Sequence, residues 1–129
     1  MNNPVGQRPV VGMYAFRSAN PRRLASFWAE VMELPVSENS TDQLVMLDFD
    51  HQVAPVTWLF QLDTSASNAS SRLSLDIGRQ TEEGWREVAD RAERAGAARK
   101  SEHELGGTRW IEMDDPDGNP FRVMAPRPT

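Results

Sequence analysis

The second half of this 129-residue sequence repeats the first half at a fixed offset of 61 residues. Asn20 and Thr81 are both helix-capping residue types, and their separation gives this offset (81 − 20 = 61). Behind each cap, apolar residues recur at positions i, i+3, i+4 and i+7, which form one face of an α-helix. These residues are Leu24, Phe27, Trp28 and Val31 in the first half, and Trp85, Val88, Ala89 and Ala92 in the second. A chain that encodes one unit twice is expected to fold into two similar modules around a shared cleft.

The first unit has the predicted element order β-α-β-β-β. Asn20-Pro21 starts its helix, since Asn caps and Pro fits the first turn, and Pro35 ends the helix after about Glu33. Two β-runs joined by the polar turn Asp50-His51-Gln52 are typical of a hairpin. The predicted strands of this unit are Val10–Phe16, Val36–Glu38, Gln43–Phe49 and Val56–Leu62.

The second unit repeats this order after a Ser/Ala/Asn-rich linker at Thr64–Ser71. Its helix is predicted at Thr81–Ala95, with Gly96 as the C-terminal stop. A loop is predicted at Glu102–Thr108, and the turn Asp115–Asn119 closes the last hairpin. The predicted strands are Arg72–Ile77, Ala97–Ser101, Arg109–Asp114 and Pro120–Ala125.

Composition limits the classes of partner and chemistry. A net charge of −5 argues against nucleic acid or an anionic membrane surface as a partner, because both call for a basic face. No apolar run is long enough to span a bilayer, and no signal peptide is evident. The absence of cysteine excludes disulfides, thiolate catalysis and iron–sulfur clusters. We therefore expect a cytoplasmic protein with a single globular domain.

Strand alternation predicts which side chains face the cleft. Leu73, Leu75 and Ile77 form an apolar row that belongs under the helices, which leaves Ser74 and Asp76 on the opposite face. Shifting this pattern by 61 residues assigns Tyr14 and Phe16 to the helix side, and the cleft side then receives Met13, Ala15 and Arg17.

The last hairpin adds a predicted cross-strand pair. Phe121 and Val123 are assigned to the core, so Arg122 and Met124 face the cleft. A symmetric turn places Glu112 opposite Arg122, and Trp110 shares the face of Glu112. The pattern leaves open whether Arg122 pairs with Glu112 or Asp76. It also leaves open whether that pair is structural or serves as an anion-binding or acid/base group.

The third cleft strand is ambiguous. Both faces of Val56–Leu62 are apolar, so alternation does not decide between Trp58 with Phe60 and Leu59 with Gln61. For Trp58 and Trp110, core packing and stacking on a flat ligand are equally compatible with the sequence.

Two motifs carry a family resemblance: Asn-Pro-Arg-Arg-Leu-Ala-Ser-Phe-Trp at 20–28 and Asp-Pro-Asp-Gly-Asn at 115–119. Together with the paired units, they resemble the vicinal oxygen chelate superfamily, which includes glyoxalase I, bleomycin-resistance proteins and extradiol dioxygenases. The resemblance covers about residues 9 to 125 and is greatest to small bacterial glyoxalase-like proteins. It implies an α+β fold in which two tandem β-α-β-β-β modules form a cup-shaped eight-stranded mixed sheet with helices outside. It also implies one glyoxalase-like domain over 1–129, with modules at about 9–63 and 72–126, and a homodimer.

Enzymes of that superfamily bind a divalent metal ion through His, Gln or Glu side chains of both modules. The resemblance places these positions at Met13, Ser74 and Arg122, and at Phe60 or Gln61. Thioether, hydroxyl and guanidinium groups are poor ligands for zinc, nickel or iron(II). The sequence therefore predicts the fold without a metal site and without a cofactor.

The side chains predicted to face the cleft favour a small-molecule-binding protein of the glyoxalase/bleomycin-resistance type. A metal-free isomerase or lyase is the alternative, in which Asp76 or Glu112 moves a proton as the candidate catalytic residue. A metal-dependent lyase or dioxygenase with non-standard ligands ranks last. His51 and His103 are both predicted to be solvated, in a turn and in a loop. The candidate ligand-binding residues are Met13, Arg17, Trp58, Phe60, Ser74, Asp76, Trp110, Glu112, Arg122 and Met124.

Overall fold

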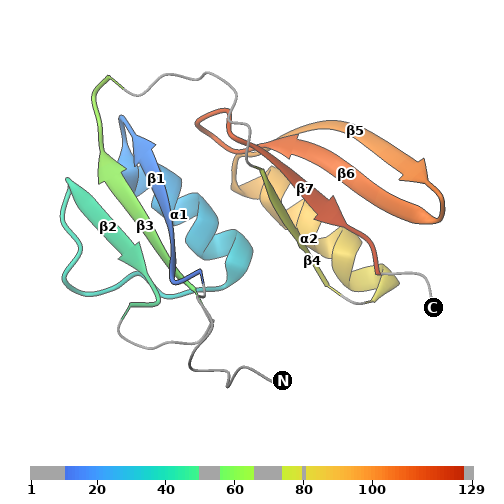
Figure 1. Cartoon of the computed structure of the whole chain (residues 1–129), viewed down its shortest axis with the longest axis horizontal. Helices are drawn as coiled ribbons and strands as arrows, with labels where there is room; N and C mark the ends of the chain where they lie inside the picture. Colours follow the sequence, from blue (N-terminus) through green and yellow to red (C-terminus); the bar gives the residue numbers. More distant parts are fainter. Residues whose placement is uncertain (1–10, 50–55, 66–73, 80, 127–129) are drawn as a thin grey trace, which may run out of the picture.

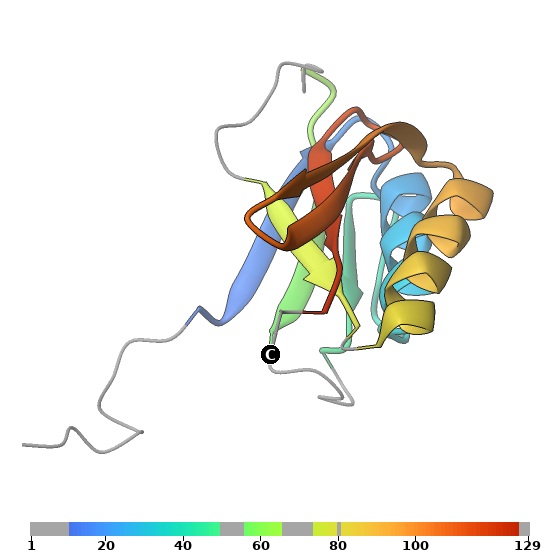
Figure 2. The ribbon, with the colours of Figure 1, turned by 90° about the vertical axis from the view of Figure 1, so that its right-hand side faces the viewer.

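A computed structural model describes residues 11–49, 56–65, 74–79 and 81–126 of the chain. Within these residues the chain forms two helices and seven strands. The strands divide between two mixed sheets, and both helices lie on the same side of the strands (Figures 1 and 2). The predicted α+β class with two repeated modules is confirmed.

Module one contains β1 (Met13–Ser18), α1 (Pro21–Met32), β2 (Leu44–Leu47) and β3 (Thr57–Leu62). Its strands lie in the order β1-β3-β2. Strand β1 runs parallel to β3, and β2 runs antiparallel to it. Helix α1 covers one face of this sheet.

Module two contains β4 (Leu75–Gly78), α2 (Glu82–Ala95), β5 (Ala98–Leu105), β6 (Thr108–Asp114) and β7 (Pro120–Met124). Its strand order is β4-β7-β6-β5, with β4 parallel to β7. Strands β4, β6 and β7 thus repeat the pairing of β1, β2 and β3, as the sequence repeat predicts.

The helix ends follow the predicted local signals. Asn20 Oδ1 accepts a hydrogen bond from the Arg23 backbone N–H at 3.2 Å, and Thr81 Oγ1 accepts one from Gly84 at 2.9 Å. These caps satisfy N–H groups that the first helical turn leaves without an intrahelical acceptor. Helix α1 ends at Glu33, whose φ of 56° lies in the left-handed region, and α2 ends at Gly96.

The eight-stranded cup is not confirmed, because one predicted strand of module one is reduced to a single bridge. In the segment Val36–Glu38, Val36 makes one antiparallel bridge to Leu47. The backbone then turns, and the Ser40 N–H bonds back to the Ser37 carbonyl at 3.2 Å. This turn leaves too little extended chain for a strand.

The equivalent strand of module two is longer than predicted. Strand β5 continues to Leu105 through the segment predicted as a loop, and pairs antiparallel with β6. Gly106 and Gly107, with φ of 59° and 84°, form the connection. Two consecutive residues with positive φ are what the type I′ turn of a two-residue hairpin requires.

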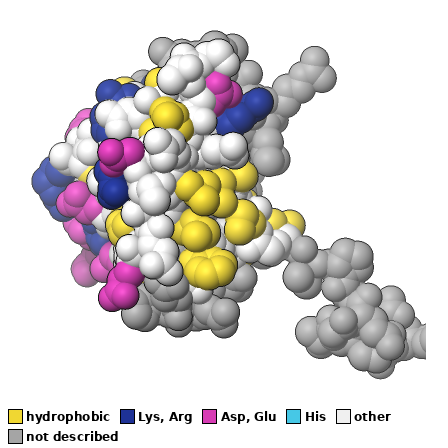
Figure 3. All heavy atoms as spheres, turned by 90° about the vertical axis from the view of Figure 1, so that its left-hand side faces the viewer, with side chains coloured by type: hydrophobic (Ala, Val, Ile, Leu, Met, Phe, Trp, Pro, Cys, Tyr) yellow, Lys and Arg dark blue, Asp and Glu magenta, His cyan; other side chains and the backbone are white. Residues whose placement is uncertain are grey.

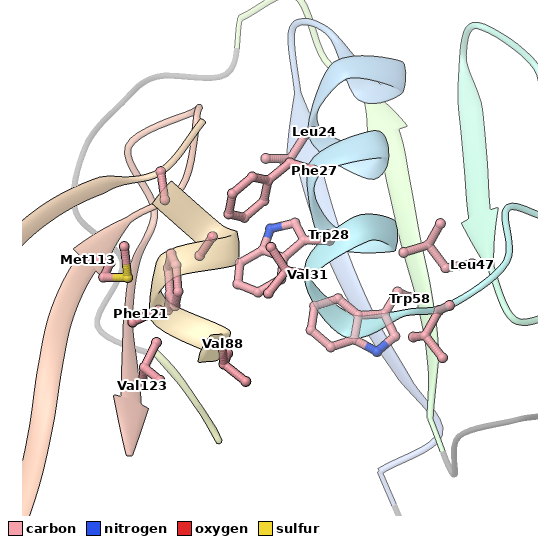
Figure 4. Packing of buried hydrophobic residues seen from close by; sticks show 14 of the residues in the cluster. Leu24, Phe27, Trp28, Val31, Leu47, Trp58, Val88, Met113, Phe121 and Val123 are labelled. Atoms are coloured by element: carbon pink, nitrogen blue, oxygen red, sulfur yellow. The ribbon is translucent and has the colours of Figure 1, made fainter. Parts of the chain in front are cut away.

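One buried cluster joins the two modules through their helices. The Trp28 ring of α1 lies 5.2 Å from Trp58 in its own module and 4.9 Å from Phe121 in the other, between ring centroids. Figure 4 shows Phe27 and Trp28 of α1 pointing toward Phe121 of β7. Neither of the described helices is long and apolar enough to cross a membrane.

Candidate functional site

The sheets have one face under the helices and one face without helices, which we call the open face (Figure 2). Strand alternation assigns every second residue to it, and the buried residues of each strand mark the opposite, helix-covered face. The open face of module two carries Asp76, Ser101, His103, Trp110, Glu112, Arg122 and Met124.

The open face of module one is mostly apolar. Met13 and Leu44 are 42% and 36% exposed, and Ala15 and Leu59 lie between them on the same face. Figure 3 views the molecule from the side of β2 and shows hydrophobic side chains gathered next to a charged region. Arg17, also on this face, lies 3.9 Å from Asp63 and remains largely exposed.

Trp58 and Phe60 belong to the core, which decides the face of β3 that the sequence left open and removes these two candidate ligand-binding residues from the open face. The register of β1 with β3 pairs Tyr14 with Trp58 and Phe16 with Phe60, beneath α1. Trp58 is 3% exposed and Phe60 is fully buried. The open face of β3 therefore presents Leu59 and Gln61.

A polar row crosses the four strands of module two. Ser101, Glu112, Arg122 and Asp76 are consecutive cross-strand neighbours. The predicted alignment of Glu112 with Arg122 is confirmed, but the hydrogen-bonded partner of Arg122 is Asp76. Its Nε and Nη2 donate to the two carboxylate oxygens at 2.8 and 2.6 Å, a bidentate ion pair. This hydrogen bonding to Asp76 raises the pKa of Arg122 against the opposing effect of desolvation.

Trp110 lies between two other members of the open face. Its ring stacks on His103, with centroids 5.4 Å apart, and the Arg122 Cζ lies 5.7 Å from the ring centroid. Trp110 Nε1 is a buried donor without a hydrogen-bond partner among the described residues. Such donors are rare in folded proteins because desolvation without a new hydrogen bond is unfavourable.

His103 is a member of this site that sequence reasoning missed. Because β5 continues beyond Ser101, His103 lies opposite Trp110 rather than in a loop. Its Nε2 lies 2.7 Å from Ser101 Oγ and 3.6 Å from Glu112 Oε2. Reading Gly106-Gly107 as a two-residue hairpin turn could have placed it. The other histidine, His51, lies outside the described residues.

The structure thus brings together five of the predicted site residues: Asp76, Trp110, Glu112, Arg122 and Met124. Met124 pairs with Trp110 across β6 and β7. Ser74 is exposed just before β4. Met13 and Arg17 belong to the other sheet.

The residues at the positions that the resemblance assigns to metal ligands do not fit a divalent cation. Arg122 brings a permanent positive charge, already paired with Asp76. Met13 offers only a thioether and Ser74 only a hydroxyl. Within the described ranges, no group of three or more His, Asp or Glu side chains could hold a metal ion.

The glyoxalase-like domain family matches residues 13–124, most of the chain. The chain belongs to this family. The glyoxalase-like domain is part of the vicinal oxygen chelate superfamily, as the two motifs suggested. No curated protein matches the sequence.

Solved structures share the fold of this glyoxalase-like protein at low sequence identity. A glyoxalase/bleomycin resistance protein/dioxygenase family enzyme from Burkholderia phytofirmans is 17% identical, with a TM-score of 0.70 over 88% of this chain and 96% of that one. The fosfomycin resistance protein of Listeria monocytogenes is 14% identical, with a TM-score of 0.74 over 94% and 96%. The bleomycin resistance determinant of transposon Tn5 is 13% identical, with a TM-score of 0.64 over 93% and 100%. At these identities the likeness establishes the fold alone.

Proposed function

We propose that this glyoxalase-like protein binds a small organic molecule on the open face of module two, without a metal ion. The observation that carries the proposal is the polar row of β4–β7, where Arg122 stands at a position that the superfamily gives to a metal ligand. A guanidinium has no free electron pair with which to coordinate a divalent cation, whereas the surrounding carboxylates and aromatic rings suit an organic ligand.

The local chemistry supports a binding site over a purely structural ion pair. Trp110 Nε1 is buried without an acceptor among the described residues, and a bound water or ligand is one explanation of such a donor. Glu112 and His103 keep 44% and 42% of their side chains exposed beside it. Two structural neighbours are named as drug resistance proteins, for bleomycin and fosfomycin, which agrees with recognition of small molecules by this fold.

A ligand screen followed by NMR tests the proposed function. Ligands that bind are expected to shift the indole N–H signal of Trp110 and the amide signals of β6 and β7, with equal affinity before and after EDTA treatment. Arg22→Ala, on helix α1 and away from the open face, is the control and should leave the affinity unchanged. Stoichiometric nickel, zinc or iron in protein purified without a chelator would contradict the proposal.

A metal-free isomerase or lyase is the second candidate, and the cluster of Glu112, His103 and Ser101 favours it. The pair of Glu112 and His103 could exchange a proton with a bound substrate. Asp76 is the weaker candidate base, because both its oxygens accept hydrogen bonds from Arg122. Recovering the bound molecule chemically unchanged after prolonged incubation favours binding, and a product absent with Glu112→Gln favours catalysis.

We also propose that the protein is a homodimer, as the family resemblance implies. The exposed apolar side chains on the open face of module one, Met13 and Leu44, support this proposal. Sedimentation velocity is expected to give twice the chain mass, and Leu44→Lys should shift the equilibrium toward the monomer.

A further inference from the structure

We infer that the ligand of the open face carries a positive charge next to an aromatic ring, as in a protonated aromatic amine. This inference rests on the proposed function and specifies the ligand class of the same site.

Arg122 does not supply a free positive charge for an anionic ligand. Two of its nitrogens donate to the two oxygens of Asp76, at 2.8 and 2.6 Å, so that one carboxylate neutralises it. An anion at the remaining nitrogen, Nη1, would meet a guanidinium whose charge Asp76 already neutralises, with the carboxylate of Glu112 on the neighbouring strand. The ion pair therefore selects against anions.

Glu112 is the carboxylate whose charge the row leaves uncompensated. Asp76, Arg122 and Glu112 together carry a net charge of −1. The neighbouring pair of Lys100 and Asp114, 3.6 Å apart, adds no net charge. A ligand cation beside Glu112 would bring the row to neutrality, and the exposed carboxylate is accessible to it.

Aromatic side chains adjoin this carboxylate. His103 and Trp110 form a stacked pair across β5 and β6, immediately next to Ser101 and Glu112 in the register. Leu105, which is 74% exposed, follows His103 on the same face of β5. A flat ring lying over His103 and Leu105 would direct an attached ammonium group toward Glu112 and the electron-rich indole.

The test uses three probes that share one ring and differ in charge: benzylamine, benzyl alcohol and benzoate. Each is titrated into the whole 129-residue chain at neutral pH and low salt, and the NMR signals of the open-face residues are followed. We expect benzylamine to bind about tenfold more tightly than benzyl alcohol, because its ammonium group gains one charge-assisted contact with Glu112. Benzoate should bind most weakly, because its carboxylate is repelled by Glu112.

Two variants test which residues cause the preference for benzylamine, and a third variant is the matched control. Glu112→Gln should abolish the advantage of benzylamine, whereas Asp76→Asn should release Arg122 and strengthen benzoate binding. Glu104→Gln removes the same charge from the helix-covered side of β5 and should change nothing. Glu112→Gln lies at an exposed position and keeps the test valid if Asp76→Asn does not fold.

The outcomes separate this inference from the proposed function. Tighter binding of benzoate than benzylamine to the unmodified protein, or a benzylamine preference that survives in Glu112→Gln, would overturn the cationic ligand and leave the binding site intact. If none of the three probes shifts an open-face signal, the site itself is wrong, and the inference falls with it.

Discussion

Asp115 lies at the centre of a hydrogen-bond network that connects the last hairpin to the first helix. This buried carboxylate accepts hydrogen bonds from the Asp117 and Asn119 backbone N–H groups at 3.0 and 2.9 Å, and from Asn119 Nδ2 at 2.8 Å. Trp28 Nε1 donates a further bond at 3.1 Å from the other module. Burial raises the pKa of Asp115, and the hydrogen bonds from Asn119 and Trp28 oppose that rise. The residue therefore fixes the Asp-Pro-Asp-Gly-Asn turn and the junction of the modules together.

Replacing Asp115 by alanine is expected to lower the free energy of unfolding by about 3 kcal/mol, because several buried donors lose their acceptor at once. Urea denaturation followed by circular dichroism measures the loss. Asp42→Ala is the control, since the Asp42 side chain is 85% exposed and its pair with Arg22 contributes less than about 1 kcal/mol. Equal losses in the two variants would show that the network is dispensable.

Glu82, at the start of α2, is expected to make the stability of the folded protein depend on pH. Its carboxylate accepts two hydrogen bonds from Arg109, which lower its pKa from 4.5 to about 2. A lowered pKa means that the pair stabilises the folded state above about pH 4.5 and that this contribution disappears as the pH falls to about 2. The melting temperature of Glu82→Gln should therefore lie below that of the unmodified protein at pH 6, and the gap should close toward pH 2. A difference in melting temperature that stays the same at every pH would contradict the stabilising role of the ionised Glu82.

At the scale of elements, the close approach of β4 to β7 holds Asp76 against Arg122. A Cβ on Gly78 would lie 2.4 Å from the backbone oxygen of Met124, closer than two such atoms can approach. Glycine is thus required for the parallel pairing of these two strands.

Gly78→Ala is expected to destabilise the protein by roughly 1–3 kcal/mol, because the two strands must move apart. It should also weaken ligand binding on the open face, where the pair of Asp76 and Arg122 spans these strands. Gly12→Ala is the matched control, since a Cβ there has no neighbour within 4 Å. Thermal unfolding of both variants measures the difference, and comparable melting temperatures would refute the close approach.

At the scale of the whole molecule, the two modules depend on one aromatic cluster. Phe121 of β7 contacts both Phe27 and Trp28 of α1, at ring centroid distances of 6.1 and 4.9 Å. Among the described residues no strand of one sheet pairs with a strand of the other, so the helices, this cluster and the bond from Trp28 to Asp115 connect the modules.

Phe121→Ala is expected to cost about 3–5 kcal/mol and to destabilise both modules together. Hydrogen exchange of the β1–β3 amides is the informative measurement, because these strands lie in the module that is not mutated. We expect the β1–β3 amides to exchange faster than in the unmodified protein, by a factor similar to that of the β4–β7 amides. Unchanged protection of β1–β3 would mean that each module is stable by itself.

The sequence by itself determined the local features of this protein: both helices with their caps, the repeat, the last hairpin and the alignment of Glu112 with Arg122. These depend on interactions between residues close in the chain or on the symmetry of a short turn. Only the tertiary structure decided the face of β3, because Trp58, Phe60 and Leu59 are all apolar and the covering helix selects between them. It also decided the partner of Arg122, since that contact depends on how β4 is placed against β7, a strand distant in sequence. The position of His103 beside Trp110 is local by contrast, because the two-residue turn at Gly106-Gly107 sets the register of β5 on β6.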